Sequence, residues 1–216
     1  MILIGDIHAD FVTYFNIIKL CDNLNEPTIQ LGDFGLGFTR TVDGVYFDEI
    51  KRDKTIPLRH KVFRGNHDNP NSFKKLEANL GDYGIYKEMF FIAGGFSIDK
   101  SMRTPMVSWW PNEELSMRQF DVILKKYEEE KPLVVISHEC PQNIKEIYLC
   151  EVDKITSKIN RTRTAVTMER MLEIWAPSYW IFAHYHPARL WENSHSKRGT
   201  TFVCIPICGM YKVPLF

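Results

Sequence analysis

The sequence predicts an α/β fold, because short apolar runs alternate with segments of helical periodicity along most of the chain. A length of 216 residues suits one domain, and 44% hydrophobic residues supply a core and argue against intrinsic disorder. Several apolar runs also stop at a polar cluster that contains Asp, Asn or His. We therefore expect a single α/β domain over residues 1–216, with strands that carry polar side chains at their carboxyl ends.

The predicted strands are short runs of aliphatic, β-branched or aromatic residues, which are typical of buried strands. The first is a continuous aliphatic run that stops at Gly5. A pair of glycines, Gly94 and Gly95, breaks the fourth run and indicates a turn there. In chain order, we expect strands within residues 1–5, 28–31, 61–64, 88–98, 133–137, 179–183 and 200–205.

The predicted helices carry apolar residues at helical spacing. In the longest, Leu115, Phe120 and Ile123 lie on one side. Ser72 is expected to cap a short helix that begins at the next residue. We expect helices at residues 9–24, 73–79, 113–130 and 165–175. Residues 142–164 are polar, and we expect them to form a local flap or insertion.

The charge balance argues against a protein that holds long polyanions by bulk charge. Lys and Arg number 27 and Asp and Glu number 27, so the formal net charge is zero. The five cysteines have no framework spacing, which favours reduced thiols in the cytoplasm, or the host cytoplasm for a viral protein. The chain shows neither a signal-peptide pattern nor an apolar span of roughly 20 residues. We therefore expect a cytoplasmic protein without a membrane segment or an extended nucleic-acid surface.

Five polar clusters follow five of the predicted strands. In open α/β sheets, ligands bind beyond the carboxyl ends of the strands, so these clusters are expected to converge on one site. The clusters contain five of the seven histidines and leave His60 and His195 as ordinary structural residues. The clusters are Asp6-Ile7-His8, Gly32-Asp33, Gly65-Asn66-His67-Asp68, Ser137-His138 and His184-Tyr185-His186.

Seven side chains in these clusters can ligate a divalent metal ion. That number exceeds the need of one tetrahedral zinc, and it suits two ions if Asp33 bridges them. After subtraction of its two carboxylates, a two-metal site carries about two positive charges, which attract phosphate without a basic protein. The predicted ligands are Asp6, His8, Asp33, Asn66, His138, His184 and His186.

The order of the five clusters resembles the motifs of the calcineurin-like metallophosphoesterases, and the resemblance extends over residues 5–186. It implies a four-layer αββα sandwich of two mixed β-sheets flanked by helices, with a dinuclear metal site at one edge. It further implies one ion on Asp6, His8, Asp33 and His186 and a second ion on Asp33, Asn66, His138 and His184. Residues 97–103 together with residues 109–114 resemble the small single-domain members from bacteria and their phages.

The resemblance also implies a reaction. A metal-bridging hydroxide would attack a phosphate mono- or diester, and His67 would contact the phosphate and protonate the leaving group. Manganese is the expected metal, although iron, zinc, cobalt or nickel suits the same ligands.

Two departures from the family pattern bear on the substrate. Leu36 and Gly37 stand where protein phosphatases of this superfamily carry an acid and an arginine, which favours small-molecule or nucleotide substrates over phosphoproteins. Ala183 replaces the usual glycine before the last histidine pair, a change between small residues. The alternatives are a Ser/Thr phosphoprotein phosphatase and a non-catalytic scaffold on the same fold.

Five further residues are candidates for the site, each with a structural alternative. Asp68 either binds His67 in a catalytic role or caps the following turn. Arg103, in a loop before two tryptophans, is expected to contact phosphate or substrate. Arg64 reaches phosphate or forms a surface salt bridge. Tyr185 faces the substrate or packs in the core. Arg163 belongs to a basic segment that either covers the metals or faces solvent.

Overall fold

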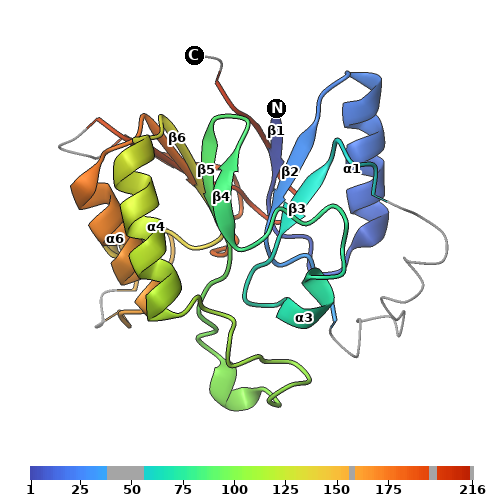
Figure 1. Cartoon of the computed structure of the whole chain (residues 1–216). Helices are drawn as coiled ribbons and strands as arrows, with labels where there is room; N and C mark the ends of the chain where they lie inside the picture. Colours follow the sequence, from blue (N-terminus) through green and yellow to red (C-terminus); the bar gives the residue numbers. More distant parts are fainter. Residues whose placement is uncertain (38–55, 156–158, 195–198, 215–216) are drawn as a thin grey trace.

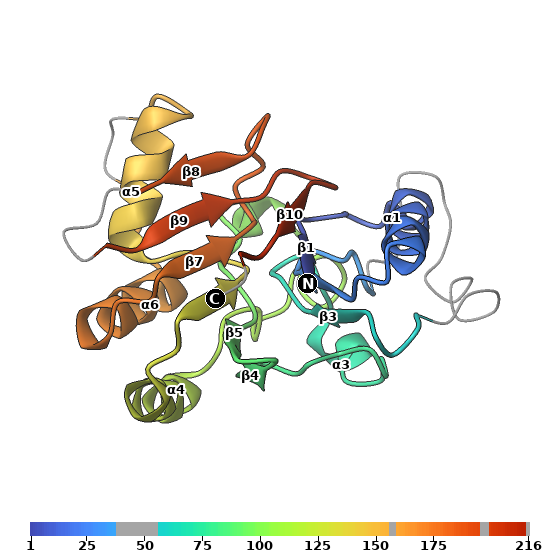
Figure 2. The ribbon, with the colours of Figure 1, turned by 90° about the horizontal axis from the view of Figure 1, so that it is seen from above.

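The computed structural model describes residues 1–37, 56–155, 159–194 and 199–214 (Figure 1). Two mixed β-sheets lie side by side, and helices cover their outer faces, so the chain forms the predicted four-layer α/β sandwich. Seen from above, α4, α5 and α6 lie on one side of the sheets, and α1 and α3 lie on the other (Figure 2). Among the described residues, no helix is long and apolar enough to cross a membrane.

The first sheet has four strands in the order β10-β1-β2-β3. Strands β1, β2 and β3 are parallel, and β10 pairs with β1 in the antiparallel direction. The strands are β1 (Ile2–Ile4), β2 (Thr28–Leu31), β3 (Lys61–Phe63) and β10 (Met210–Lys212).

The second sheet has six strands in the order β4-β5-β6-β7-β9-β8. Its four inner strands are parallel, and β4 and β8 form antiparallel edges. The strands are β4 (Tyr83–Tyr86), β5 (Met89–Ile92), β6 (Val134–Ser137), β7 (Tyr179–Phe182), β8 (Trp191–Asn193) and β9 (Thr201–Cys204).

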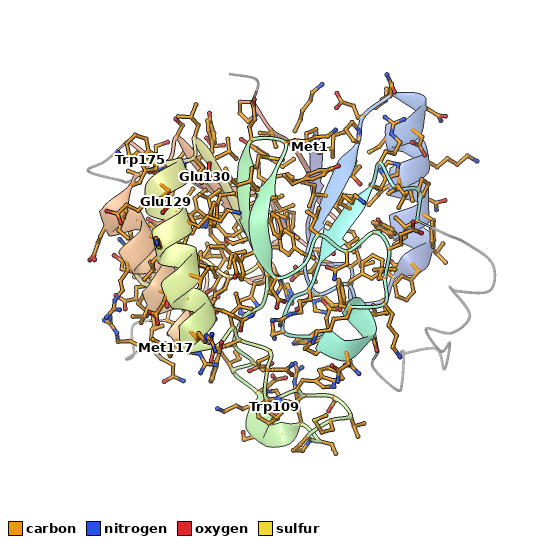
Figure 3. All side chains as sticks on the ribbon, in the orientation of Figure 1. Met1, Trp109, Met117, Glu129, Glu130 and Trp175 are labelled. Carbon is orange, nitrogen blue, oxygen red and sulfur yellow. The ribbon has the colours of Figure 1, made fainter. Side chains whose placement is uncertain are left out.

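The helices begin at polar caps in most cases. Asp10 accepts a hydrogen bond from the Thr13 amide at the start of α1, and Thr162 caps α6 in the same way. The helices are α1 (Phe11–Asn23), α3 (Pro70–Phe73), α4 (Met117–Glu130), α5 (Gln142–Glu151) and α6 (Arg163–Ile174), and a 3₁₀ turn, η1, spans Lys100–Met102. The loop around η1 projects beyond the ends of the strands, and Trp109 lies in it (Figures 1 and 3).

Three apolar layers hold the sandwich together. The middle layer lies between the sheets, where Leu31 and Phe63 of the first sheet pack with Phe91 and Ile136 of the second. The two outer layers join each sheet to its helices. Because the inner strands are buried on both faces, they are continuous apolar runs, as the sequence predicted.

Two predicted helices have the wrong boundaries. The short helix ends at Phe73 instead of beginning there, because Asn69 caps it and Pro70 occupies its first position. The long helix begins at Met117, four residues later than predicted, where Ser116 and Gln119 form a reciprocal capping box.

The polar segment 142–164, predicted as a local flap or insertion, contains a helix in the part that the structure describes. Its first residues form α5, and Ile144 and Tyr148 of this helix belong to the core beneath the second sheet. The predicted flap falls in part on residues 156–158, which lie outside the described residues.

Strands β4, β8 and β10 were not predicted. The turn between β4 and β5 has positive φ angles at Lys87 and Glu88, so it reverses the chain without the Asn-Gly or Asp-Gly signal that usually marks such a hairpin. The other two strands are only three residues long and lie at sheet edges.

Candidate metal centre

The predicted ligands meet where the parallel strands of both sheets end. Strands β1, β2 and β3 deliver residues from the first sheet, and β6 and β7 deliver residues from the second. Each side chain lies within four residues of the end of its strand, so the register of the two sheets places all seven at one edge. They are Asp6, His8, Asp33, Asn66, His138, His184 and His186.

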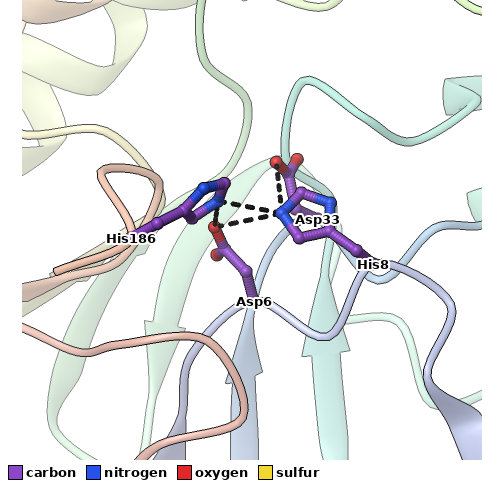
Figure 4. Close-up of side chains that lie close together, drawn as sticks. All are labelled: Asp6, His8, Asp33 and His186. Atoms are coloured by element: carbon purple, nitrogen blue, oxygen red, sulfur yellow. Dashed lines mark hydrogen bonds and ion pairs between the residues drawn. The ribbon is translucent and has the colours of Figure 1, made fainter. Parts of the chain in front are cut away.

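One set of four donors faces solvent on one side. Ligand atoms of Asp6, His8, Asp33 and His186 all lie within 4.8 Å of one another. His186 Nε2 is 2.7 Å from Asp6 Oδ2 and 2.8 Å from His8 Nε2 (Figure 4). Nitrogen and carboxylate oxygen atoms in this arrangement can hold one divalent ion.

A second set shares Asp33 with the first. Ligand atoms of Asp33, His138 and His184 also lie within 4.8 Å of one another. His138 Nε2 is 3.2 Å from Asp33 Oδ1 and 2.9 Å from Asn66 Oδ1, so the Asn66 amide belongs to this group. Two donor sets that share one carboxylate match the arrangement predicted from the sequence.

A backbone carbonyl fixes the tautomer of His138. Its Nδ1 lies 2.8 Å from the carbonyl oxygen of Leu31. Because a carbonyl oxygen only accepts, Nδ1 carries the proton and donates it there. Nε2 therefore points its lone pair at the centre in the neutral ring, as a metal ligand requires.

The backbone at the ligands is strained. His8, Asp33, His184 and His186 have positive φ angles between 43° and 70°, in the left-handed region that these residues rarely adopt. Gly32 is needed beside them, because a Cβ atom there would lie 2.6 Å from His138 Nδ1. Four strained ligand residues in one cluster indicate that the fold imposes the positions of these side chains.

The cluster favours positive charge at its centre. Burial opposes a charged ring at His138, yet Asp33 and Asp6 raise its pKa to about 10. Burial also opposes ionisation of Asp33, but the neighbouring His138 and His67 hold its pKa well below the usual range. Burial and the charge of His138 lower the pKa of His184 well below its ordinary value. Carboxylates and lone-pair nitrogens in such a setting fit divalent cations.

His67 and Arg103 lie together beside the exposed donor set. The Arg103 guanidinium donates to His67 Nε2 and is held by Asp99, with an Nε–Oδ1 distance of 2.8 Å. The ring of His67 packs edge-on against His8, with centroids 5.0 Å apart. The projecting loop thus brings Arg103 beside the exposed donor set, and its contact with phosphate stays a prediction.

The Asp68 carboxylate binds backbone amides of two loops. Its two oxygens accept hydrogen bonds from the backbone amides of Phe34, Gly35, Leu36 and Gly65, at distances of 2.8 to 3.1 Å. Burial and the nearby charge of Asp33 raise the pKa of Asp68 to about 7. Asp68 therefore joins two loops, which supports the structural alternative for this residue, and a catalytic role for Asp68 stays a prediction.

Arg64 and Arg163 lie apart from the described donors. Arg64 Nε pairs with Asp82 at 2.8 Å, and its Nη1 donates to the Glu113 carbonyl. Arg163 lies 3.8 Å from Glu114. Both arginines line a cavity of about 470 Å³, and neither has a contact with the seven donors within the described part of the chain.

Tyr185 packs in the core. Its ring lies against Tyr148 and Phe182, at centroid distances of 5.2 and 5.9 Å, and against the ring of His184. Of the two alternatives for this residue, the packing role fits the structure.

The remaining histidine that the structure describes is also structural. His60 is buried between Thr28 Oγ1 and Asp22 Oδ1, both at 3.0 Å. His195 lies outside the described residues. The five cysteines are free, and Cys204 lies in strand β9 as expected.

Two buried residues next to Asn66 are not among the site residues predicted from the sequence. Ser97 Oγ lies 3.0 Å from Asn66 Nδ2, and Glu113 Oε2 lies 2.6 Å from Ser97 Oγ. Ser97 and Glu113 belong to no motif at a strand end, and Glu113 was assigned to a helix. Both residues lie in the segments that resemble the small bacterial and phage members, but that resemblance assigns no role to them.

Comparisons with known proteins agree with the geometry. A family model described as calcineurin-like phosphoesterase matches residues 1–188. Among solved structures, the crystal structure of TT1561 from Thermus thermophilus superposes with a TM-score of 0.54 at 13% sequence identity. The match covers 96% of this chain and 89% of that chain, and at this identity it shows a shared fold. A search among curated proteins gives no match.

Proposed function

Since the chain belongs to the calcineurin-like phosphoesterase family, we propose that it hydrolyses small-molecule or nucleotide phosphate esters with two divalent metal ions. The observation that carries the proposal is the convergence of seven donors into two sets that share Asp33. Asp6, His8, Asp33 and His186 would hold one ion, and Asp33, Asn66, His138 and His184 would hold the other. The chemistry that two such ions supply when bound is activation of water and neutralisation of phosphoryl charge.

Arg103 is suited to bind the phosphate. A guanidinium only donates hydrogen bonds, and its planar fork matches two phosphate oxygens. Arg103 is also prepositioned, because Asp99 holds it beside His67 and the exposed donors. When a phosphate binds Arg103, the guanidinium N–H group donates to a phosphate oxygen in place of His67.

His67 is then available for the leaving group. Its backbone amide donates to Asp33 Oδ1 at 2.7 Å, which fixes the start of its side chain at the edge of the centre. We assign to His67 the protonation of the departing ester oxygen, a general-acid role that suits an imidazole. His67 lies next to Arg103, so one phosphate ester can contact both residues.

The surroundings favour a compact substrate. The chain has no net charge, and its phosphate attraction would arise locally from the ions and Arg103. Leu36, at a position where protein phosphatases carry a charged residue, is fully buried and offers no contact to a phosphopeptide. All seven donors are in place, which supports an enzyme over a scaffold. The five free cysteines support a cytoplasmic location.

The proposal is tested with p-nitrophenyl phosphate and its bis-ester, followed by a panel of cyclic nucleotides, cyclic dinucleotides, dinucleoside polyphosphates and phosphopeptides. We expect turnover with added Mn²⁺ that disappears after chelation, and two equivalents of metal in the loaded protein. Iron, zinc, cobalt and nickel are compared under the same conditions. The best substrate should be a small molecule or nucleotide, and preferential turnover of phosphopeptides would instead assign a phosphoprotein phosphatase.

Asp33→Ala is the decisive variant, because it removes the carboxylate that both donor sets share. We expect it to abolish metal-dependent turnover, whereas Asp121→Ala, a matched change on the exposed face of α4, should leave turnover unchanged. Turnover that survives in Asp33→Ala, or wild-type protein that takes up no metal, would contradict the proposal and favour the scaffold.

A further inference from the structure

We propose that Ser97 and Glu113 are positioning residues that fix which end of the Asn66 amide faces the metal centre. The inference rests on the proposed function, because it concerns the second ion of the pair. It assigns a role to two residues that contact neither ion.

A continuous hydrogen-bonded chain supports this role. Asn66 Nδ2 donates to Ser97 Oγ at 3.0 Å, and Ser97 Oγ donates to Glu113 Oε2 at 2.6 Å. The Ser97 amide donates to the other carboxylate oxygen at 3.0 Å. On the opposite side, Asn66 Oδ1 lies 2.9 Å from His138 Nε2. All of these side chains are at least 97% buried, so bulk water does not compete for the bonds.

The chemistry of the donors determines the direction of the chain. An asparagine amide has an oxygen at one end and an NH₂ group at the other, and only the oxygen can bind a cation. Burial raises the pKa of Glu113, whereas the two hydrogen bonds from Ser97 act against that rise because they favour the ionised carboxylate. That carboxylate only accepts hydrogen bonds, so it takes the single hydroxyl proton of Ser97. Ser97 can then only accept from Asn66. The NH₂ end of Asn66 must therefore face Ser97, and Oδ1 faces the centre.

Glu113 is itself held in place from a second direction. Arg64 Nη1 donates to its carbonyl oxygen at 2.6 Å, and Arg64 Nε pairs with Asp82. Helix α4 begins only after Ser116, and Glu113 lies in the turn before it, where its amide donates to the Trp110 carbonyl at 2.9 Å and its carboxylate reaches Ser97. The arginine that the sequence analysis considered for phosphate binding thus supports this chain instead.

The first test is Glu113→Gln. The Ser97 amide is an obligatory donor, so it will face the glutamine oxygen and leave the glutamine NH₂ group towards Ser97 Oγ. Ser97 is then free to donate its hydroxyl proton to Asn66 Oδ1. The Asn66 amide can therefore turn its NH₂ group towards the centre, and in that orientation it cannot bind a cation. Residues behind metal ligands typically contribute about 10- to 100-fold to metal affinity. In calorimetric titrations of metal-free protein with Mn²⁺, we expect this loss for the second ion and none for the first.

Two matched controls accompany this variant. Glu114→Gln makes the same change one residue later, where the carboxylate caps α6 through the Thr164 amide, and it should leave both affinities unchanged. Ser97→Ala should weaken the second ion as Glu113→Gln does, whereas Ser108→Ala in the same loop should not. Thermal unfolding of each metal-free variant shows whether it folds. If Glu113→Gln does not fold, Ser97→Ala replaces it as the test variant.

A double-mutant cycle separates positioning from general stabilisation. Asn66→Asp places an oxygen against Ser97, whose single proton cannot serve two carboxylates. In this background Glu113→Gln releases the Ser97 proton for Asp at position 66. We therefore expect Glu113→Gln to raise the affinity for the second ion in Asn66→Asp and to lower it in the wild type. A merely structural role would lower it in both backgrounds.

The outcomes distinguish the inference from the proposed function. If the wild type binds two ions and Glu113→Gln binds both within twofold of it, the inference is overturned and the function stands. An equal loss in both backgrounds overturns the inference as well. A wild type that takes up fewer than two Mn²⁺ ions contradicts the proposed function and removes this inference with it.

Discussion

The two donor sets differ in how the protein surrounds them. His8 and His186 of the first set have side chains that are 27% and 38% exposed, whereas the His138 side chain in the second set is fully buried. The exposed histidines contact mainly other members of the cluster. His138 and Asn66 are instead held from behind by the Leu31 carbonyl and by Ser97. If the proposed function holds, the exposed set would give access to substrate and the more buried set would keep the geometry.

The largest expected effect comes from a comparison of His138→Ala with His8→Ala. His138→Ala removes a candidate metal ligand and leaves the Leu31 carbonyl and Asn66 Oδ1 without their His138 partner in a buried site. We expect kcat/KM to fall by more than ~1000-fold, which corresponds to about 4 kcal/mol of activation free energy. The same variant should lower the free energy of unfolding by about 2 to 4 kcal/mol. His8→Ala should reduce turnover less and leave stability nearly unchanged. Steady-state kinetics with Mn²⁺ and denaturant unfolding measure both, and equal effects on stability would remove the distinction between the sets.

Asp68→Asn should affect both sets alike, because the Asp68 carboxylate joins the loop after Asp33 to the loop that carries Asn66. The four backbone amides donate to the two oxygens of Asp68, two to each oxygen. An asparagine would face two of these amides with its own NH₂ group, and the loss of those two hydrogen bonds should lower the free energy of unfolding by about 2 to 3 kcal/mol. Urea denaturation checks the stability, and calorimetry should find both Mn²⁺ affinities reduced. A loss confined to one ion would show that the Asp68 carboxylate serves only one loop.

Arg103→Ala should leave both ions in place and change only the substrate. Loss of a charge-assisted contact to phosphate is worth about 2 kcal/mol, so we expect KM to rise roughly 30-fold. Arg103→Lys keeps the positive charge but loses the planar pair of donors, so its KM should lie between the values of the wild type and Arg103→Ala. Kinetics and Mn²⁺ titration on the same samples check this prediction, and a changed metal affinity would contradict a role for Arg103 that is confined to the substrate.

The smallest effect is a gain in stability. His8 has a φ angle of 43°, a conformation that glycine adopts without strain. His8→Gly should lose affinity for the first ion yet raise the free energy of unfolding of the metal-free protein by about 1 kcal/mol. His8→Ala removes the same ligand but keeps the Cβ atom, so it should show no gain. Equal stability of the two variants would mean that the strain at His8 is negligible.

The convergence of the seven candidate donors could be predicted from sequence because each follows a buried strand within four residues. A short apolar run, its polar ending and its parallel neighbours are all local signals, and the sheet converts them into one site. The same reasoning placed most strands, since continuous apolar runs are typical of strands that are covered on both faces.

The residues behind the ligands could not be predicted in this way. Ser97 meets Asn66 from 31 positions away, and Asp68 reaches Leu36 from 32 positions away. Such bonds depend on how loops pack after the sheets have formed, and no pattern of neighbouring residues encodes them. Arg64 is similar, because its pairing with Asp82 and Glu113 is decided by burial that only the three-dimensional structure shows.

The pairing of β10 with β1 has a consequence for folding. Strand β1 ends just before Asp6, and its outer edge is completed only by residues 210–212. The Asp6 carbonyl also accepts a hydrogen bond from the Cys208 amide at 2.8 Å. A contact between the two ends of the sequence closes late, because a long loop must be ordered first. The segment that carries Asp6 is therefore held in part by residues 208–212, so we expect a chain that ends before them to hold this candidate donor less firmly.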